Sequence, residues 1–286
     1  MTVVELGLGA RAALAVDGRG RVVAVYRRAA YLQVPGGLVA LTTADVWRGP
    51  LHVRSPVAPD RLAPGDVVDV VGGCHVRVGR AGVVDLAGAS VWRGALPDLA
   101  GLDPSAIDVF AAAPPPALLA DERFAGRLGV ALHRLRQGDL AGVARAIGGL
   151  GPGLTPAGDD TLAGILLVTR ARGGEAAEDG LVAVAQSVAT TSVARALLEW
   201  AARGQTVEPA HDLLAAIAAG DGPAAAVHLS ALVRLGHTSG ADLAYGLHLG
   251  LDHPNECHGR PLGVPAPGDR SPEAPDAPDH VAHMVP

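Results

Sequence analysis

Residues 148–164 read GGLGPGLTPAGDDTLAG, a loop rich in glycine and proline that leads into a helix. Glycine lets the backbone turn sharply and lets a ligand approach it closely. The first turn of a helix carries unpaired N–H groups and a partial positive charge. The segment therefore predicts a binding site for a phosphate or carboxylate group at a helix start.

A second segment, residues 236–246, reads GHTSGADLAYG and repeats part of this pattern. Two glycines and one aspartate recur 82 positions apart, in the pairs Gly158 and Gly240, Asp160 and Asp242, and Gly164 and Gly246. Glycines inside a helix suit close contact with a second helix. We therefore expect two helices packed side by side, with their N-termini converging on one ligand. Either aspartate alone would be an ordinary helix cap.

The predicted site takes its residues from these two segments and from the hydroxyl run Thr190-Thr191-Ser192. The expected ligand-binding residues are Gly151, Gly153, Thr155, Gly158, Asp159, Thr191, Ser192, Thr238, Ser239 and Gly240. The expected catalytic residues are Asp160, Asp242 and His237. Histidine titrates near neutral pH and can act as an acid or a base, although His237 can equally be a simple helix-start residue. Three hydroxyl residues in a row disfavour a helix interior, so residues 190–192 either line the pocket or interrupt the helix.

The aspartates at an anion site allow three interpretations. Their oxygens can accept hydrogen bonds from a ligand NH₂ group while backbone N–H groups hold the ligand oxygens. Asp159 and Asp160 can instead help to hold a Mg²⁺ ion that bridges a phosphate, which makes Mg²⁺ a possible cofactor. In the third interpretation Asp160 and Asp242 only orient the loops. The residue types do not choose among these roles.

The composition excludes several classes of protein. The chain has 286 residues, 49% of them hydrophobic and 3% aromatic, with a net charge of −6. Little aromatic content and no basic stripe argue against nucleic-acid binding. All the basic residues are arginine, so Schiff-base, pyridoxal phosphate and Walker-type mechanisms, which need lysine, are excluded. No signal peptide or membrane-length apolar run is evident, so we expect a cytoplasmic protein.

The order of the sequence patterns predicts an α+β fold. Residues 1–95 contain short Val-rich runs separated by Gly, Pro and Asp, which predict an antiparallel sheet or a small barrel. Residues 96–117 look like a connector. Residues 118–252 carry apolar side chains at three- and four-residue spacing, which predicts an all-helical domain of six or seven helices. Residues 253–286 are rich in proline and predict a disordered tail.

Three motifs in this order resemble the AllH family. They are GLGPGLTPAGDDTLAG at 149–164, TTSVARALL at 190–198 and GHTSGADLAYGL at 236–247. AllH is a subunit of oxamate carbamoyltransferase, an enzyme of anaerobic allantoin catabolism. The resemblance implies transfer of a carbamoyl group between oxalurate and phosphate, which gives oxamate and carbamoyl phosphate. It also implies companion subunits and a small anionic substrate.

Two other functions remain open at this stage. TPAGDDTLAG resembles the anion hole of ribokinase-like small-molecule kinases, in which an aspartate beside a helix start acts as a base. Those kinases place a doubly wound α/β domain before the motif, whereas the pattern here is strands first and then helices. The chain can also be a non-catalytic module that binds an anion within a larger complex.

Overall fold

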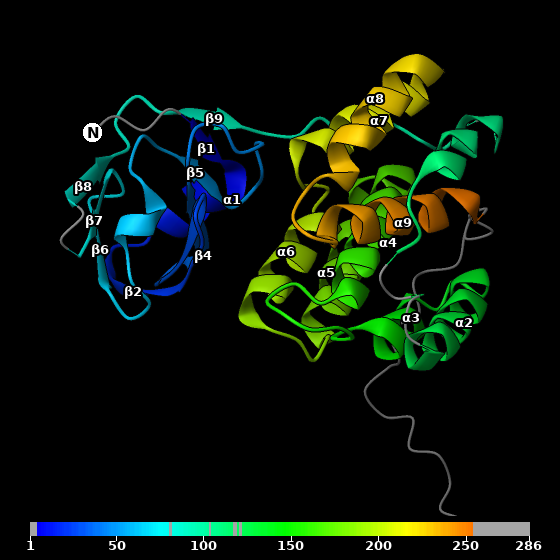
Figure 1. Cartoon of the computed structure of the whole chain (residues 1–286), viewed down its shortest axis with the longest axis horizontal. Coiled ribbons are helices and arrows are strands. Elements are labelled where there is room, and N and C mark those ends of the chain that lie inside the picture. The colour runs from blue at the N-terminus through cyan, green and yellow to red at the C-terminus, as the bar shows by residue number, and fades with distance from the viewer. Residues whose placement is uncertain (1–4, 80–81, 103, 117–118, 120–121, 254–286) are drawn as a thin grey trace, which may run out of the picture.

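A computed structural model describes residues 5–253 except 80–81, 103, 117–118 and 120–121 (Figure 1). It contains a sheet region, formed by β1–β9 and helix α1, and a helical region, formed by α2–α9. The predicted α+β class, with strands first and helices after them, is confirmed. The predicted tail, apart from His253, lies outside the described residues.

The sheet region is one sheet of nine strands, in the order β8-β7-β6-β2-β3-β4-β5-β1-β9. Its strands are β1 (Glu5–Gly7), β2 (Gly18–Val25), β3 (Ala29–Val34), β4 (Gly37–Thr42), β5 (His52–Arg54), β6 (Val67–Val71), β7 (His75–Val78), β8 (Gly82–Asp85) and β9 (Ser90–Trp92). Side chains alternate between buried and less buried along β3 and β7, so one face of the sheet curls around a core that includes Leu32, Val68 and Val76.

Two details of this region differ from the prediction. The sheet was expected to be antiparallel, but β1 pairs with β9 and β4 pairs with β5 in parallel. A parallel neighbour needs a connection longer than a hairpin, and such pairings leave no local signal in the sequence. The short helix α1 (Leu8–Leu14) was also not predicted. It follows β1 directly and buries Ala10, Ala13 and Leu14.

The helical region contains eight α-helices among its described residues, slightly more than expected. They are α2 (Glu122–Arg136), α3 (Leu140–Ile147), α4 (Ala157–Gly173), α5 (Glu178–Ser187), α6 (Ser192–Ala202), α7 (Glu208–Ala218), α8 (Gly222–Val233) and α9 (Ser239–Asp252). The expected connector carries a 3₁₀ segment, Pro104–Ala112. The hydroxyl run at residues 190–192 separates α5 from α6, as one of the two predicted alternatives requires. None of the described helices has the length and apolarity needed to cross a membrane.

Helices α2–α4 and α7–α9 repeat one arrangement at a separation of 82 positions. Gly138 ends the turn after α2 with φ 70°, and Gly220 ends the turn after α7 with φ 68°. The next residue is an N-cap in both halves. Asp139 accepts a hydrogen bond from the Gly142 N–H at 2.7 Å, and Asp221 accepts one from Ala224 at 2.9 Å. Helices α7–α9 therefore repeat the arrangement of α2–α4, with α5 and α6 between the two copies.

The third helices of the two halves, α4 and α9, form the most extensive helix contact in the molecule. An alanine Cβ at Gly246 would lie 2.0 Å from the Thr161 carbonyl oxygen, and one at Gly164 would lie 2.5 Å from that of Leu243. Thr161 and Leu243 are themselves 82 positions apart, so the contacts are related by a local twofold axis. The helices run parallel with their N-termini together, which confirms the predicted packing.

Candidate functional site

The two glycine-rich segments meet at the starts of α4 and α9. The Thr155 hydroxyl lies 3.0 Å from the Ser239 hydroxyl, although 84 positions separate them in the chain. Asp160 and Asp242 stand in the first turns of the two helices. The packing of α4 against α9 therefore brings these two hydroxyls and two carboxyls to one place.

Asp160 is the most perturbed acid in this group. Burial raises the pKa of its carboxyl well above the ordinary value, and the neighbouring Asp242 and Asp159 raise it further. Hydrogen bonds from Ser239 and Thr155 oppose part of this shift. Its Oδ2 atom is buried and has no hydrogen-bond partner within the described part of the chain. Its surroundings thus disfavour the charged form of Asp160, and one of its polar atoms is left for a ligand.

Asp242 and Asp159 occupy different positions. Asp242 is fully buried, at 0% exposure, and its N–H donates to the Thr238 carbonyl at 3.0 Å. Asp159 accepts a hydrogen bond from the Gly149 N–H at 2.8 Å on one oxygen and from the Thr190 hydroxyl on the other. Burial raises the pKa of Asp159 as well. Because both of its oxygens are engaged, Asp159 holds the glycine loop against the hydroxyl run.

The hydroxyl run connects α6 to the same loop. The Thr191 hydroxyl donates to the Leu154 carbonyl at 2.5 Å and accepts from the Ala194 N–H at 3.0 Å, so it caps α6. Ser192 is the exposed first residue of α6 and lies on a cleft between the helical and sheet regions. Of the two predicted alternatives, the helix interruption is confirmed.

The glycines of the predicted site divide into two groups. Gly151 and Gly153 have φ of 120° and 92°, a conformation that L side chains rarely adopt, so they shape the loop. Gly158 and Gly240 were expected to contact the ligand. Their N–H groups instead donate to Leu150 and Leu235 carbonyls at 2.8 and 3.0 Å.

Gly158 and Gly240 also lie against the ends of the preceding helices. An added Cβ at either position would come within 1.9 Å of a carbonyl oxygen, that of Ile147 or Leu232 respectively. Both glycines therefore permit close helix packing, and their N–H groups are paired within the backbone.

The second segment contributes two further predicted residues. His237 is exposed on the turn between α8 and α9. Thr238 is the N-cap residue of α9 but makes no side-chain cap hydrogen bond. Among the described residues, neither side chain makes a hydrogen bond to Asp160.

The sequence match covers this whole arrangement. Residues 147–251 match the AllH family, described as oxamate carbamoyltransferase subunit AllH. The match runs from the end of α3 to α9 and so includes both segments and the hydroxyl run. It confirms the resemblance carried by the three motifs. No solved structure matches the chain.

One residue near the site lies outside the AllH match and was missed by sequence reasoning. Tyr31, on β3, packs with Leu154 of the glycine loop against the cluster formed by Leu38, Leu51 and Val193. Burial raises the pKa of the Tyr31 hydroxyl, and Tyr26 and Asp160 raise it further. The sheet region thus places the Tyr31 hydroxyl close enough to Asp160 for the charge of that carboxyl to affect its pKa. A tyrosine in an alternating strand gives no sequence signal for such a role.

The geometry does not favour the suggested Mg²⁺ site at Asp159 and Asp160. Asp159 uses one oxygen for Gly149 and the other for Thr190. Among the residues described, there is also no group of three or more His, Cys, Asp and Glu side chains placed to hold a metal ion. A Mg²⁺ ion at Asp159 would share its oxygens with the Gly149 and Thr190 hydrogen bonds.

Proposed function

We propose that the chain is an AllH-type subunit of a carbamoyltransferase, and that the paired starts of α4 and α9 bind the carbamoyl-bearing substrate. The observation that carries the proposal is the Asp160 carboxyl. One of its oxygens is buried between two glycine-rich helix starts and has no hydrogen-bond partner among the residues that the structure describes. Buried polar groups are ordinarily hydrogen-bonded, so this oxygen supports a role in ligand binding.

The chemistry of carbamoyl transfer suits these groups. In the expected reaction a phosphate oxygen attacks the carbamoyl carbon of oxalurate, and the bond from that carbon to the oxamate nitrogen breaks. The departing nitrogen must take up a proton. Asp160 has a raised pKa and is the acid proposed to supply it. In the reverse direction the same carboxylate would take the proton back.

The paired helix starts are proposed to stabilise the charge of the reaction. Negative charge develops on the carbamoyl oxygen in the transition state, and fixed N–H dipoles stabilise such charge without reorganising. The partial positive charges of α4 and α9 add at their meeting point. A protonated, neutral Asp160 would not repel an incoming phosphate, which answers the apparent contradiction of acids at an anion site.

The match to a subunit implies companion subunits, and we propose that turnover requires them. The isolated chain would then bind substrate without completing the reaction. A ribokinase-like kinase is less consistent with the fold, because the described sheet has mainly antiparallel pairs and is not a doubly wound α/β domain. If the chain only binds the anion, the experiment below would show binding without turnover.

The test combines binding and turnover. Calorimetry of the isolated chain with oxalurate, oxamate, carbamoyl phosphate and phosphate, with and without Mg²⁺, measures binding. Production of carbamoyl phosphate from oxalurate and phosphate by the chain with its companion subunits measures turnover. We expect Asp160→Asn to lower turnover by at least ~100-fold, the scale of one general acid. Unchanged turnover in a folded Asp160→Asn complex would overturn the proposed role.

The Mg²⁺ arms of the same experiment address the cofactor. If a metal bridges phosphate through Asp159, Asp159→Asn should remove a Mg²⁺-dependent gain in phosphate affinity. The hydrogen bonds of Asp159 predict instead that phosphate affinity is the same with and without Mg²⁺.

A further inference from the structure

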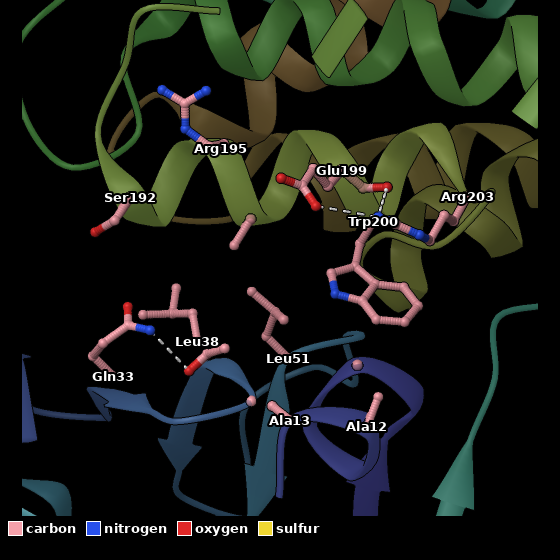
Figure 2. A pocket seen from close by; sticks show the side chains of 14 residues that line it. Ala12, Ala13, Gln33, Leu38, Leu51, Ser192, Arg195, Glu199, Trp200 and Arg203 are labelled. Carbon is pink, nitrogen blue, oxygen red and sulfur yellow. Dashed lines mark hydrogen bonds and ion pairs between the residues drawn. The ribbon is translucent and has the colours of Figure 1, made fainter. Parts of the chain in front are cut away.

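Tyr31 belongs to the sheet region, but its side chain is on the face of β3 that is turned toward the helical region. Leu32 and Val34 are buried in the core of the sheet region. Because side chains alternate along a strand, Tyr31 and Gln33 lie on the opposite face. Gln33 and Leu38, its partner on β4, line the cleft between α6 and the sheet region and point toward α6 (Figure 2). Tyr31 shares this orientation.

The apolar cluster around Leu38 holds Tyr31 beside the glycine loop. Tyr31 and Leu154 pack against the same cluster, which also contains Val193 of the first turn of α6. Leu154 directly precedes Thr155, whose hydroxyl lies 3.0 Å from that of Ser239. The cluster therefore places Tyr31 close to the point where α4 and α9 begin.

The Tyr31 hydroxyl lies within electrostatic range of the Asp160 carboxyl but is not hydrogen-bonded to it. Burial raises the pKa of Tyr31, and the charges of Tyr26 and Asp160 raise it further. The raised pKa keeps the phenol protonated at neutral pH, so it is a hydrogen-bond donor without negative charge. A small ligand at Asp160 can therefore contact the phenol as well.

This hydroxyl has no hydrogen-bond partner among the residues that the structure describes. The Tyr31 ring packs against the apolar cluster and meets the Tyr26 ring edge to face, with 6.2 Å between the ring centroids. These contacts engage the ring and leave the hydroxyl free to donate. Polar groups in partly buried positions are ordinarily hydrogen-bonded, so a ligand oxygen is a suitable acceptor.

Other donors at the starts of α4 and α9 are already engaged. The hydroxyls of Thr155 and Ser239 hydrogen-bond the Asp160 carboxyl. The backbone N–H groups of Asp160 and Asp242 donate to carbonyl oxygens within the chain. An anion that binds among these acidic side chains therefore needs a further donor, and Tyr31 can supply it.

We propose that the Tyr31 hydroxyl donates a hydrogen bond to an oxygen of the anion that binds at the starts of α4 and α9. This inference rests on the proposed function. Its acceptor is an oxyanion, either phosphate or the carboxylate of an oxamate group. The substrate site then extends beyond residues 147–251, the part of the chain that matches AllH, and includes the sheet region.

Calorimetry of the full chain with phosphate and, separately, with oxamate tests this contact. Tyr31→Phe removes the hydroxyl and keeps the ring, so the melting temperature should change little. We expect this variant to bind at least one of the two anions about tenfold more weakly, which corresponds to ~1.4 kcal/mol. The anion that is affected identifies the group that Tyr31 contacts. Tyr26→Phe, on the neighbouring ring that is 52% exposed, should bind both anions like the wild type.

The outcomes separate this contact from the proposed function. If the wild type binds an anion and Tyr31→Phe binds both anions equally well, the Tyr31 contact is wrong and the site at Asp160 stands. Equal weakening in Tyr31→Phe and Tyr26→Phe would assign the loss to ring packing and also overturn the contact. If the wild type binds neither anion, the proposed function and the Tyr31 contact both fail.

Nuclear magnetic resonance of the chain with isotope-labelled tyrosine Cζ gives a second readout. The signal that is missing from Tyr31→Phe belongs to Tyr31. It should shift as the anion is added, with the same midpoint as the calorimetric titration. A Tyr31 signal that stays in place while the anion binds would contradict the proposed hydrogen bond.

Discussion

At the scale of single residues, the site depends on the different surroundings of its aspartates. Asp159 has both oxygens occupied by Gly149 and Thr190, and it holds a loop. Asp160, the next residue, has a buried oxygen that no described residue hydrogen-bonds. A helix turns about 100° per residue, so neighbouring side chains face different directions. This explains why two adjacent aspartates at one helix start have different roles.

Asp160→Asn should stabilise the folded chain at neutral pH. The folded state raises the pKa of Asp160, so stability falls as the pH rises above the unfolded value of about 3.9 toward the folded pKa. Asparagine keeps an oxygen for Ser239 and Thr155 but carries no charge. The gain in the free energy of unfolding should therefore be absent near pH 4 and grow as the pH rises toward the raised folded pKa, as measured by urea denaturation. Asp60→Asn, at an exposed position, is the control. An advantage independent of pH would contradict the burial argument.

Thr191→Ala should destabilise the chain more than removal of a comparable cap elsewhere. Its hydroxyl both caps α6 and holds the Leu154 carbonyl, so we expect a loss of about 1.5–3 kcal/mol in the free energy of unfolding. Asp221→Ala removes an exposed cap of α8 alone and should cost about 1 kcal/mol. Thr191→Ser should recover most of the loss in denaturant titrations. Failure of serine to do so would assign the effect to the threonine methyl group.

At the scale of helices, the repeated arrangement shows what the sequence could and could not reveal. The repeated Gly, Asp and Gly positions predicted the parallel α4–α9 pair, because a glycine-lined contact needs specific residues at fixed spacing. The rest of the repeat was not recognised. The sequence holds one further signal, since Gly138-Asp139 and Gly220-Asp221 are both a turn glycine followed by a helix cap. Most other paired positions need only be apolar, so their identities differ.

Other features depend on contacts that no local pattern encodes. Tyr31 meets the glycine loop because the two regions pack together, and the parallel strand pairs depend on long connections. The close packing at Gly158 and Gly240 is hidden for a different reason. A glycine that permits close packing and a glycine that exposes its N–H to a ligand look the same in a sequence.

Gly246→Ala should strongly destabilise the helical region. The new Cβ would lie 2.0 Å from the Thr161 carbonyl oxygen and would force α4 and α9 apart. Overpacking of this kind costs ~1–3 kcal/mol or more, measurable by thermal or chemical denaturation. Gly129→Ala in α2 is a matched control, because nothing lies within 4 Å of its new Cβ and alanine favours a helix by about 1 kcal/mol. Equal effects of the two substitutions would contradict the close helix contact.

At the scale of the whole molecule, the sheet and helical regions are joined by a few well-defined contacts. Gln205 accepts from the Gly94 N–H at 2.9 Å and donates to its carbonyl at 3.0 Å. His211 bonds the Ala95 carbonyl at 2.9 Å, and burial lowers its pKa, so it stays neutral. These bonds fix the segment that connects the two regions. The cleft beside Ser192 and the approach of Tyr31 to Asp160 both depend on how this segment holds the two regions together.

The contact between Arg48 and Glu208 adds an ionic link between the regions. The Glu208 carboxylate accepts hydrogen bonds from the Arg48 guanidinium and from the backbone N–H of Arg48, the latter at 3.2 Å. The backbone N–H of Glu208 donates in turn to the Arg48 carbonyl at 2.9 Å. The hydrogen bond from Arg48 lowers the pKa of Glu208. A lowered carboxyl pKa contributes stability above the unfolded value of about 4.3, and that stability is lost as the pH falls through the folded pKa.

Glu208→Gln should therefore weaken the junction at neutral pH but not in acid. The Arg48 pair is partly exposed, so solvent screening limits the expected loss at pH 7 to about 1 kcal/mol in the free energy of unfolding. The difference from wild type should shrink as the pH falls through the lowered folded pKa of Glu208, where the carboxylate becomes protonated. Hydrogen exchange at residues 93–96 should rise in the variant at pH 7, because the connecting segment loses a neighbouring restraint. Asp69→Asn removes an exposed ion pair within the sheet region and should leave that exchange unchanged. If Glu208→Gln costs the same at pH 7 and pH 3.5, the junction does not depend on the carboxylate charge.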